Sequence, residues 1–244
     1  FQYTGEELRA MGETASSFQV AVGFRNCEWF VVLLPVLAAF PWTDRFTEQW
    51  TGGSYYLMIS RKTRNSYALG NMLQAAVTGF SVLAAGILVY ILLVWLRFPA
   101  YQMQGEESMI AWTYGATVTE RGIYLARAVV HTSLLGAACA VISTLLAAAL
   151  RDRFFALSIP MLSAYASDKL SDAWLYHLTV KYDFGPVPGN AWWPGFLFPS
   201  QHLFYDTNFT STFGLGYGVY LAFLLGLLVV MFAVFLCMVK RRNV

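Results

Sequence analysis

The chain has 244 residues, of which 57% are hydrophobic and only 12% are charged, and its mean hydropathy is +0.51. A soluble domain usually carries about twice that charged fraction, so the composition excludes a soluble globular protein and indicates a membrane protein. The net charge of +2 is too small to indicate a nucleic-acid partner. Three widely spaced cysteines form no zinc or disulfide pattern.

The first membrane span is expected over residues 26–42, after a mixed segment over 1–27 that contains no span. Its apolar run is just long enough to cross about 30 Å of hydrocarbon as a helix. Pro35 is expected to kink this helix, which membranes tolerate when neighbouring groups satisfy the freed carbonyl. We interpret Pro41 and Trp42 as the end of the span.

A polar loop is expected over residues 44–68, and Arg61, Lys62 and Arg64 lie near its end. Short loops rich in Lys and Arg are retained in the cytoplasm. We predict a short helix around residues 54–60 that docks on a soluble protein through one apolar side. The side chains that share this apolar side are Tyr55, Tyr56, Met58 and Ile59, and the basic residues are available for carboxylates or lipid phosphates. Gly52 and Gly53 supply the flexible backbone for a sharp turn.

Further spans are expected over residues 69–96, 122–150 and 213–239, because each contains a long apolar run. A fourth stretch, over residues 154–176, is apolar for only about 13 residues, which as a helix is about 20 Å and short of a full crossing. It is nevertheless assigned as a span, because the basic segments on either side of it are expected on the same side of the membrane.

The distribution of Lys and Arg sets the expected orientation. The segments placed inside (44–68, 151–153 and 240–244) hold nine of these residues in about 33 positions, whereas those placed outside hold six in roughly 100. The C-terminus is therefore expected in the cytoplasm. The chain begins with Phe1 on the outside, so a further span before it is expected, which makes six spans in the whole protein.

The segment over residues 177–212 is expected outside the cytoplasm. Its prolines and glycines exclude a long helix in its middle, and its many aromatic side chains are too apolar for a free aqueous loop. Two interpretations stay open for these aromatics: packing on the outer membrane face, or a gate that contacts an exported molecule.

Arg127 and His131 lie one helical turn apart, roughly 8 to 14 Å into the span that begins near Gly122. A charge inside a membrane span is a candidate functional site, and the alternative is a structural ion pair or a position near the headgroups. No catalytic constellation and no metal-ligand spacing is recognised among the histidines and cysteines. No phosphate-binding Gly-Lys-Ser/Thr loop is present, so the chain is not expected to hydrolyse ATP itself.

One stretch of the chain carries a family resemblance. Its residues are Pro35, Pro41, Glu48 four positions before Gly52-Gly53, then Arg61, Arg64 and Tyr67 at intervals of three, and Thr78-Gly79 in the next span. This pattern resembles the permease subunit of bacterial ABC-2-type exporters, although Asn71 stands where a lysine is common in that family. The resemblance implies that the loop 44–68 holds the helix that contacts the ATPase. The coupling residues would be Glu48, Gly52, Gly53, Tyr55, Tyr56, Ile59, Arg61, Arg64 and Tyr67.

The expected fold is an all-α polytopic membrane protein with five spans in this chain. The resemblance implies a transport path between this permease and a second, identical or related one, in a bacterial cytoplasmic membrane. ATP and magnesium would be bound by separate ATPase subunits, with no cofactor in this chain. Small residues on the spans are expected at close helix contacts along the path: Gly79, Gly86, Gly136, Gly214 and Gly218. Two alternatives remain, a non-transporting membrane partner such as an immunity or sensor subunit, and an intramembrane enzyme.

Overall fold

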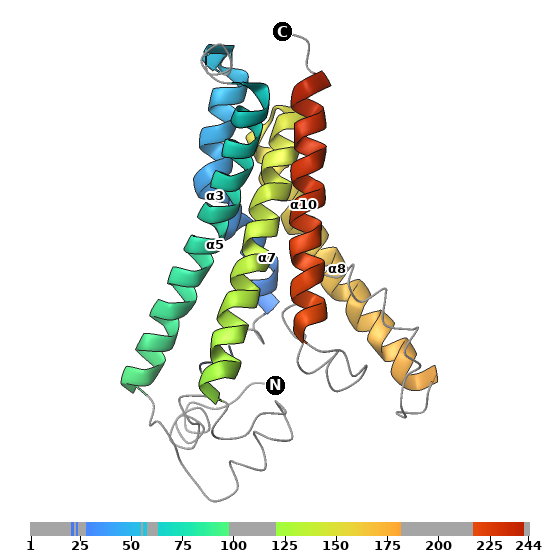
Figure 1. The fold of residues 1–244 in the computed structure, drawn as a ribbon. Coiled ribbons are helices and arrows are strands. Elements are labelled where there is room, and N and C mark those ends of the chain that lie inside the picture. Colours follow the sequence, from blue (N-terminus) through green and yellow to red (C-terminus); the bar gives the residue numbers. More distant parts are fainter. Residues whose placement is uncertain are drawn as a thin grey trace, which may run out of the picture.

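The computed structural model describes residues 21, 23, 28–54, 56–57, 63–97, 121–181 and 217–241. Within these residues the chain forms five long helices and no strand, which confirms the all-helical expectation (Figure 1). They are α3 (Glu28–Thr51), α5 (Arg64–Arg97), α7 (Arg121–Leu150), α8 (Arg153–Lys181) and α10 (Tyr217–Arg241).

Four of these helices, α3, α5, α7 and α10, are long and apolar enough to cross a membrane, which indicates a multi-pass membrane protein. The fifth, α8, has 29 residues and is therefore about 44 Å long, but Asp168, Lys169 and Asp172 interrupt its apolar surface. In Figure 1, α8 begins where α7 ends and runs back toward the opposite end of the bundle. The stretch predicted over 154–176 thus lies within one continuous helix, which is more polar than the other four.

The first described helix, α3, does not end at Pro41 and Trp42 as predicted but continues to Thr51. Proline removes one backbone hydrogen bond from a helix, and the turns beyond Pro41 bury Trp42, Phe46 and Trp50 on one face. The burial of three large aromatic side chains outweighs the lost hydrogen bond.

The next helix, α5, begins at Arg64 rather than near 69. The side chain of Thr63 caps it, because its Oγ1 accepts a hydrogen bond of 3.2 Å from the Ser66 N–H. The loop predicted over 44–68 is therefore reduced to a connection over residues 52–63.

Helices α5 and α7 cross with their backbones in contact. A Cβ atom added to Gly79 would lie 2.7 Å from the Cβ of Ala140 and 2.7 Å from the carbonyl oxygen of Gly136. Gly79 and Gly136 are therefore used for packing within this chain rather than against a second subunit. Gly86, by contrast, has no such neighbour within 4 Å, and Gly214 lies outside the described residues.

The turn between α7 and α8 is tight and well capped. Arg151 has a φ of 59°, in the left-handed region that reverses the chain at the end of a helix. The Asp152 Oδ1 then accepts hydrogen bonds from the backbone N–H groups of Phe154 (2.7 Å) and Phe155 (3.1 Å). This carboxylate satisfies the first donors of α8, so the two helices meet with almost no connecting loop.

Candidate functional site

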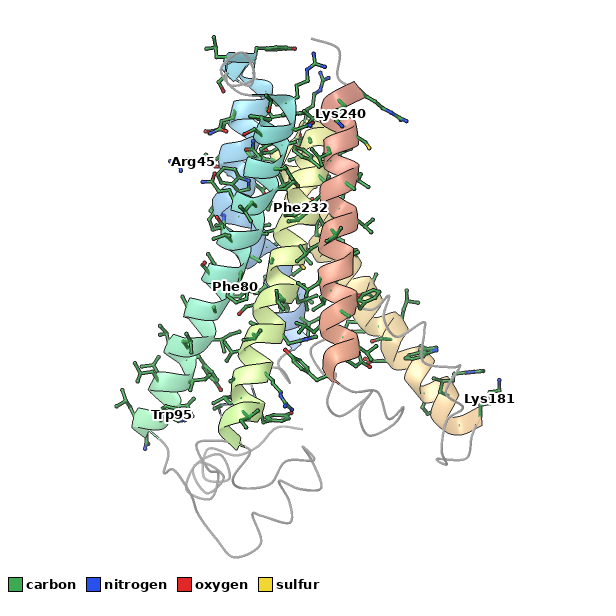
Figure 2. All side chains as sticks on the ribbon, viewed as in Figure 1. Arg45, Phe80, Trp95, Lys181, Phe232 and Lys240 are labelled. Carbon is green, nitrogen blue, oxygen red and sulfur yellow. The ribbon has the colours of Figure 1, made fainter. Side chains whose placement is uncertain are left out.

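The connection between α3 and α5 lies at the end of the bundle where α7 passes into α8 and where α10 ends (Figure 1). We call this the basic end, because its described cations outnumber its described acids. The cations are Arg45, Arg64, Arg151, Arg153, Lys240 and Arg241, and the acids are Asp44, Glu48 and Asp152. Lys240 marks this end in Figure 2, and Trp95 and Lys181 mark the opposite end.

The chain leaves α3 through the glycine pair. The Gly52 N–H donates to the carbonyl oxygen of Glu48 at 2.8 Å, and Gly53 has a φ of +80°, a conformation that L side chains rarely adopt. The Tyr56 N–H then donates to the Gly53 carbonyl oxygen at 3.1 Å. The pair therefore reverses the chain at the end of the helix, and a larger side chain at Gly53 would strain the backbone.

Part of the predicted docking helix is described, namely Ser54, Tyr56 and Leu57, and all three are helical. Tyr56 is 48% exposed and Leu57 is 68% exposed. Glu48 and Arg64, at the two sides of the connection, are also exposed. Five of the residues predicted for docking lie outside the described part of the chain: Tyr55, Met58, Ile59, Arg61 and Lys62.

Tyr67 does not belong to this exposed group. Only 4% of it is exposed, and its ring stacks on Trp50 with 6.5 Å between centroids and 15° between planes. One turn inside α5, its side chain faces α3 rather than the aqueous end of the connection. Tyr67 therefore lies in the core and not on the exposed surface of the connection, and its predicted part in coupling could only be indirect.

An aromatic cluster lies directly beneath the connection. It consists of Trp42, Phe46, Trp50, Tyr67 and Phe235, all nearly buried. The Phe46 and Trp50 rings stack at 5.4 Å, and Phe235 from α10 approaches them at 6.0 and 6.1 Å. The Trp50 Nε1–H donates to the Ala148 carbonyl oxygen of α7 at 3.0 Å. This aromatic cluster joins the end of α3 to α5, α7 and α10.

The sequence contains the signal for this cluster. Trp42, Phe46 and Trp50 recur at intervals of four, the spacing of one helix face, within a stretch interpreted as the end of a span and the start of a loop. Asp44 on the same helix pairs with Arg153 of α8, with 3.1 Å between Oδ1 and the guanidinium nitrogen. The end of α3 therefore contacts every other described helix.

The predicted polar pair lies at the opposite end of the bundle, between α7 and α10. Arg127 is exposed, and its guanidinium carbon lies 5.7 Å from the centre of the Tyr217 ring. His131 is only 1% exposed, and its ring lies 5.8 Å from Tyr217 and 6.2 Å from Tyr220. The structure brings Arg127 and His131 together with two tyrosines that the sequence pattern did not indicate.

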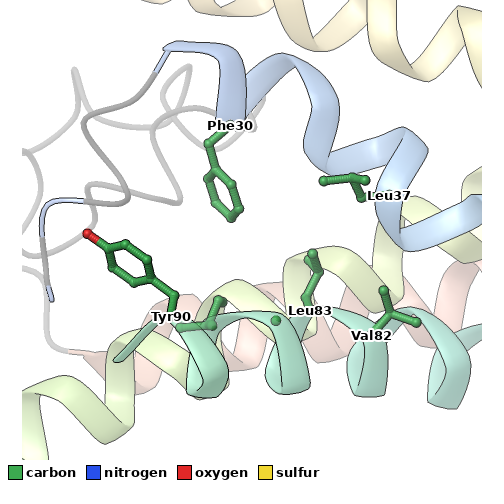
Figure 3. A pocket seen from close by; sticks show the side chains of 7 residues that line it. Phe30, Leu37, Val82, Leu83 and Tyr90 are labelled. Carbon is green, nitrogen blue, oxygen red and sulfur yellow. The ribbon is translucent and has the colours of Figure 1, made fainter. Parts of the chain in front are cut away.

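A third feature is an apolar groove of about 340 Å³ between α3 and α5. It is lined by Phe30, Leu37, Val82, Leu83, Ile87 and Tyr90 (Figure 3), and Gly86 leaves its floor open. The groove opens on the exposed apolar surface of α5 and has no charged lining residue, so it is suited to hydrocarbon.

The described residues bring no three His, Cys, Asp or Glu side chains together as metal ligands. In comparisons with known proteins, no protein-family model, no curated protein and no solved structure matches this chain.

Proposed function

We propose that this chain is the transmembrane permease subunit of an ATP-driven exporter of the ABC-2 type. The observation that carries the proposal is the connection between α3 and α5, which combines exposed Tyr56 and Leu57 with a flanking Arg64. The family resemblance lies in the same stretch, over residues 35–79. A membrane protein that receives force from a soluble ATPase needs such a contact element at one end of its helices.

The aromatic cluster beneath the connection supports a mechanical role. A displacement of residues 52–63 would be transmitted to α3 through the glycine turn. The packed rings of Trp50, Tyr67 and Phe235 would then transmit it to α5, α7 and α10. Packed aromatic side chains transmit displacement because protein interiors are dense and compress little. Closure of the ATPases would in this way reorient several helices together.

The charge distribution supports an orientation. The three basic segments, which hold Arg64, Arg153 and Lys240, lie at one end of the bundle. Under the positive-inside rule this end faces the cytoplasm, and the C-terminus with it. A bacterial cytoplasmic membrane is then the setting, and ATP with magnesium would be bound by separate subunits on that side.

A second permease, identical or related, would complete the transport path. The polar residues in the middle of α8, among them Asp168 and Asp172, support a role for this helix along that path. Polar groups in a membrane helix face a partner or a water-filled cavity far more often than lipid.

The test is reconstitution of the chain with an ATP-binding subunit that co-purifies with it. Tyr56→Ala removes an exposed aromatic anchor, and truncation of such an anchor at the centre of an interface costs about 2 kcal/mol. Arg64→Glu reverses a charge beside it. We expect both variants to insert normally, because the apolar runs of the spanning helices are unchanged, but to co-purify poorly with the ATPase and to lower ATP turnover.

The matched control is Tyr176→Ala, which removes an exposed tyrosine of α8 at the opposite end of the bundle. It should leave both association and turnover unchanged. Full association and normal turnover in both Tyr56→Ala and Arg64→Glu would remove the coupling role. Ligand-stimulated ATP turnover without solute movement would instead indicate a sensor subunit.

A further inference from the structure

Arg127 is a cation on an apolar helix that no described acid neutralises. The sequences of α5, α7 and α10 contain no Asp or Glu. Within the described residues Arg127 forms no ion pair, and its guanidinium contacts only the ring of Tyr217, at 5.7 Å. A cation–π contact lowers the energy of a cation but leaves its charge in place, so Arg127 still attracts an anion.

The position of Arg127 along α7 places it at the depth of lipid headgroups. The apolar span Gly122–Leu150 has 29 residues, which is about 44 Å of helix and matches the 40–45 Å of a bilayer with its headgroups. Arg127 lies five residues from the start of this span, or about 8 Å, close to the boundary between headgroups and hydrocarbon. Because the arginine is exposed, lipid phosphates lie within its reach.

The neighbouring side chains leave the binding edge of the guanidinium available. The Tyr217 ring centre lies 5.7 Å from the guanidinium carbon, and a contact of this kind does not use the N–H donors, which point outward in the guanidinium plane. His131 lies one turn deeper against Tyr217 and Tyr220 and fills the inner side. The arrangement is therefore closed toward the bundle and open toward the membrane surface.

We propose that Arg127, held by Tyr217, binds the phosphate of an anion at the end of the bundle opposite the basic end. The phosphate group has two sources, an anionic phospholipid and a water-soluble phosphate ester. The headgroup depth and the exposure of Arg127 on a membrane-spanning helix favour the phospholipid. This site is independent of the transport function proposed above, because it lies at the other end of the molecule from the connection.

The experiment measures phospholipid binding to the purified chain by native mass spectrometry. Phosphatidylglycerol is titrated against the wild type and the variants Arg127→Gln, Arg127→Lys and Tyr217→Leu. Diacylglycerol supplies the same chains without phosphate, and glycerol 3-phosphate supplies the phosphate without chains. The matched control is Arg97→Gln, which removes an exposed arginine of α5 at the same end that contacts no ring and no acid among the described residues.

We expect Arg127→Gln to weaken the tightest phosphatidylglycerol binding about tenfold, the effect of losing a charge-assisted hydrogen bond. Arg127→Lys should keep part of the affinity for phosphatidylglycerol, because the charge is retained. The affinity of Tyr217→Leu should lie between those of the wild type and Arg127→Gln. Arg97→Gln and the diacylglycerol titration should show no such dependence.

Two results would overturn the proposal. Equal phosphatidylglycerol binding in Arg127→Gln and Arg97→Gln would show that Arg127 contributes no more than any interfacial arginine. Failure of Arg127→Lys to bind better than Arg127→Gln, with both variants as helical as the wild type by circular dichroism, would exclude recognition of a charge. Tight binding of glycerol 3-phosphate that depends on Arg127 would support the phosphate site and assign it to a soluble ester.

Discussion

The two ends of the helical bundle are built differently. At the basic end, α3, α5, α7 and α10 converge on the aromatic cluster, and Trp50 is 3% exposed. At the opposite end, α5 and α8 diverge from the bundle, and Trp95 is 59% exposed (Figures 1 and 2). The end that carries the proposed contact for a soluble partner is thus the tightly packed one.

The contrast can be followed along α5 alone. At its start, buried residues come in two adjacent pairs, Tyr67 with Ala68 and Asn71 with Met72. From Ala75 onward they recur singly, about one per turn, to the end of the helix. A helix with two buried residues per turn is held on a broad face, whereas one per turn leaves most of its surface to lipid. The first turns of α5 are therefore expected to move with the bundle and its far end to move more independently.

The test with the largest expected effect compares Trp50 with Trp95. Trp50→Ala empties the aromatic cluster and removes the hydrogen bond to the Ala148 carbonyl, and a buried Trp→Ala change costs about 3 kcal/mol. Trp95→Ala removes a side chain of the same size from the exposed end of α5 and should cost less than about 0.5 kcal/mol. Unfolding in mixed micelles, followed by circular dichroism during SDS titration, measures both. An equal decrease in the free energy of unfolding for both variants would show that the two ends are packed alike.

A second test addresses the crossing of α5 with α7 at Gly79. Gly79→Val places a side chain where even a Cβ would lie 2.7 Å from the Gly136 carbonyl oxygen, and backbone cannot yield as a side-chain tip can. Forcing extra volume into such a contact costs about 1–3 kcal/mol. Gly86→Val, two turns further along the same helix, enters open space and serves as the control. The same SDS titration measures both, and a Gly86→Val loss as large as that of Gly79→Val would contradict the close crossing.

The sequence predicted the helices well where apolar runs had polar flanks. The span expected over 122–150 differs by one residue from α7, and that over 69–96 lies within α5. The error came at Pro41, because a proline followed by polar residues resembles the end of a span. Beyond Pro41, the charged Asp44 and Arg45 lie in sequence between the buried Trp42 and Phe46. The helix therefore continues as an amphipathic one.

The site was predicted less completely, and the reason is physical. In a membrane helix the lipid-facing surface is as apolar as the packed surface, so hydrophobic periodicity does not separate them. The burial of Tyr67 at the start of α5 therefore could not be predicted from the pattern of its neighbours. Likewise, nothing in the sequence connects Arg127 with Tyr217, because the contact depends on how α7 packs against α10.

The smallest expected effect concerns the ion pair between α3 and α8. Asp44 and Arg153 are 3.1 Å apart but partly exposed, and such pairs contribute less than about 1 kcal/mol. A double-mutant cycle with Asp44→Asn and Arg153→Gln isolates their coupling from other effects of each change. We expect a coupling of about 0.5 kcal/mol in the SDS titration, which decreases as salt is raised because exposed charges are screened.

The pair formed by Asp168 and Lys169 is the matched control for that cycle. These residues are neighbours on α8, with 3.4 Å between their charged atoms, so their interaction joins no second helix. The same cycle on Asp168→Asn and Lys169→Gln should give a smaller coupling. If it equals that of Asp44 and Arg153, the ion pair adds nothing specific between α3 and α8. The attachment of α3 at the basic end would then depend on the aromatic cluster and the Trp50 hydrogen bond alone.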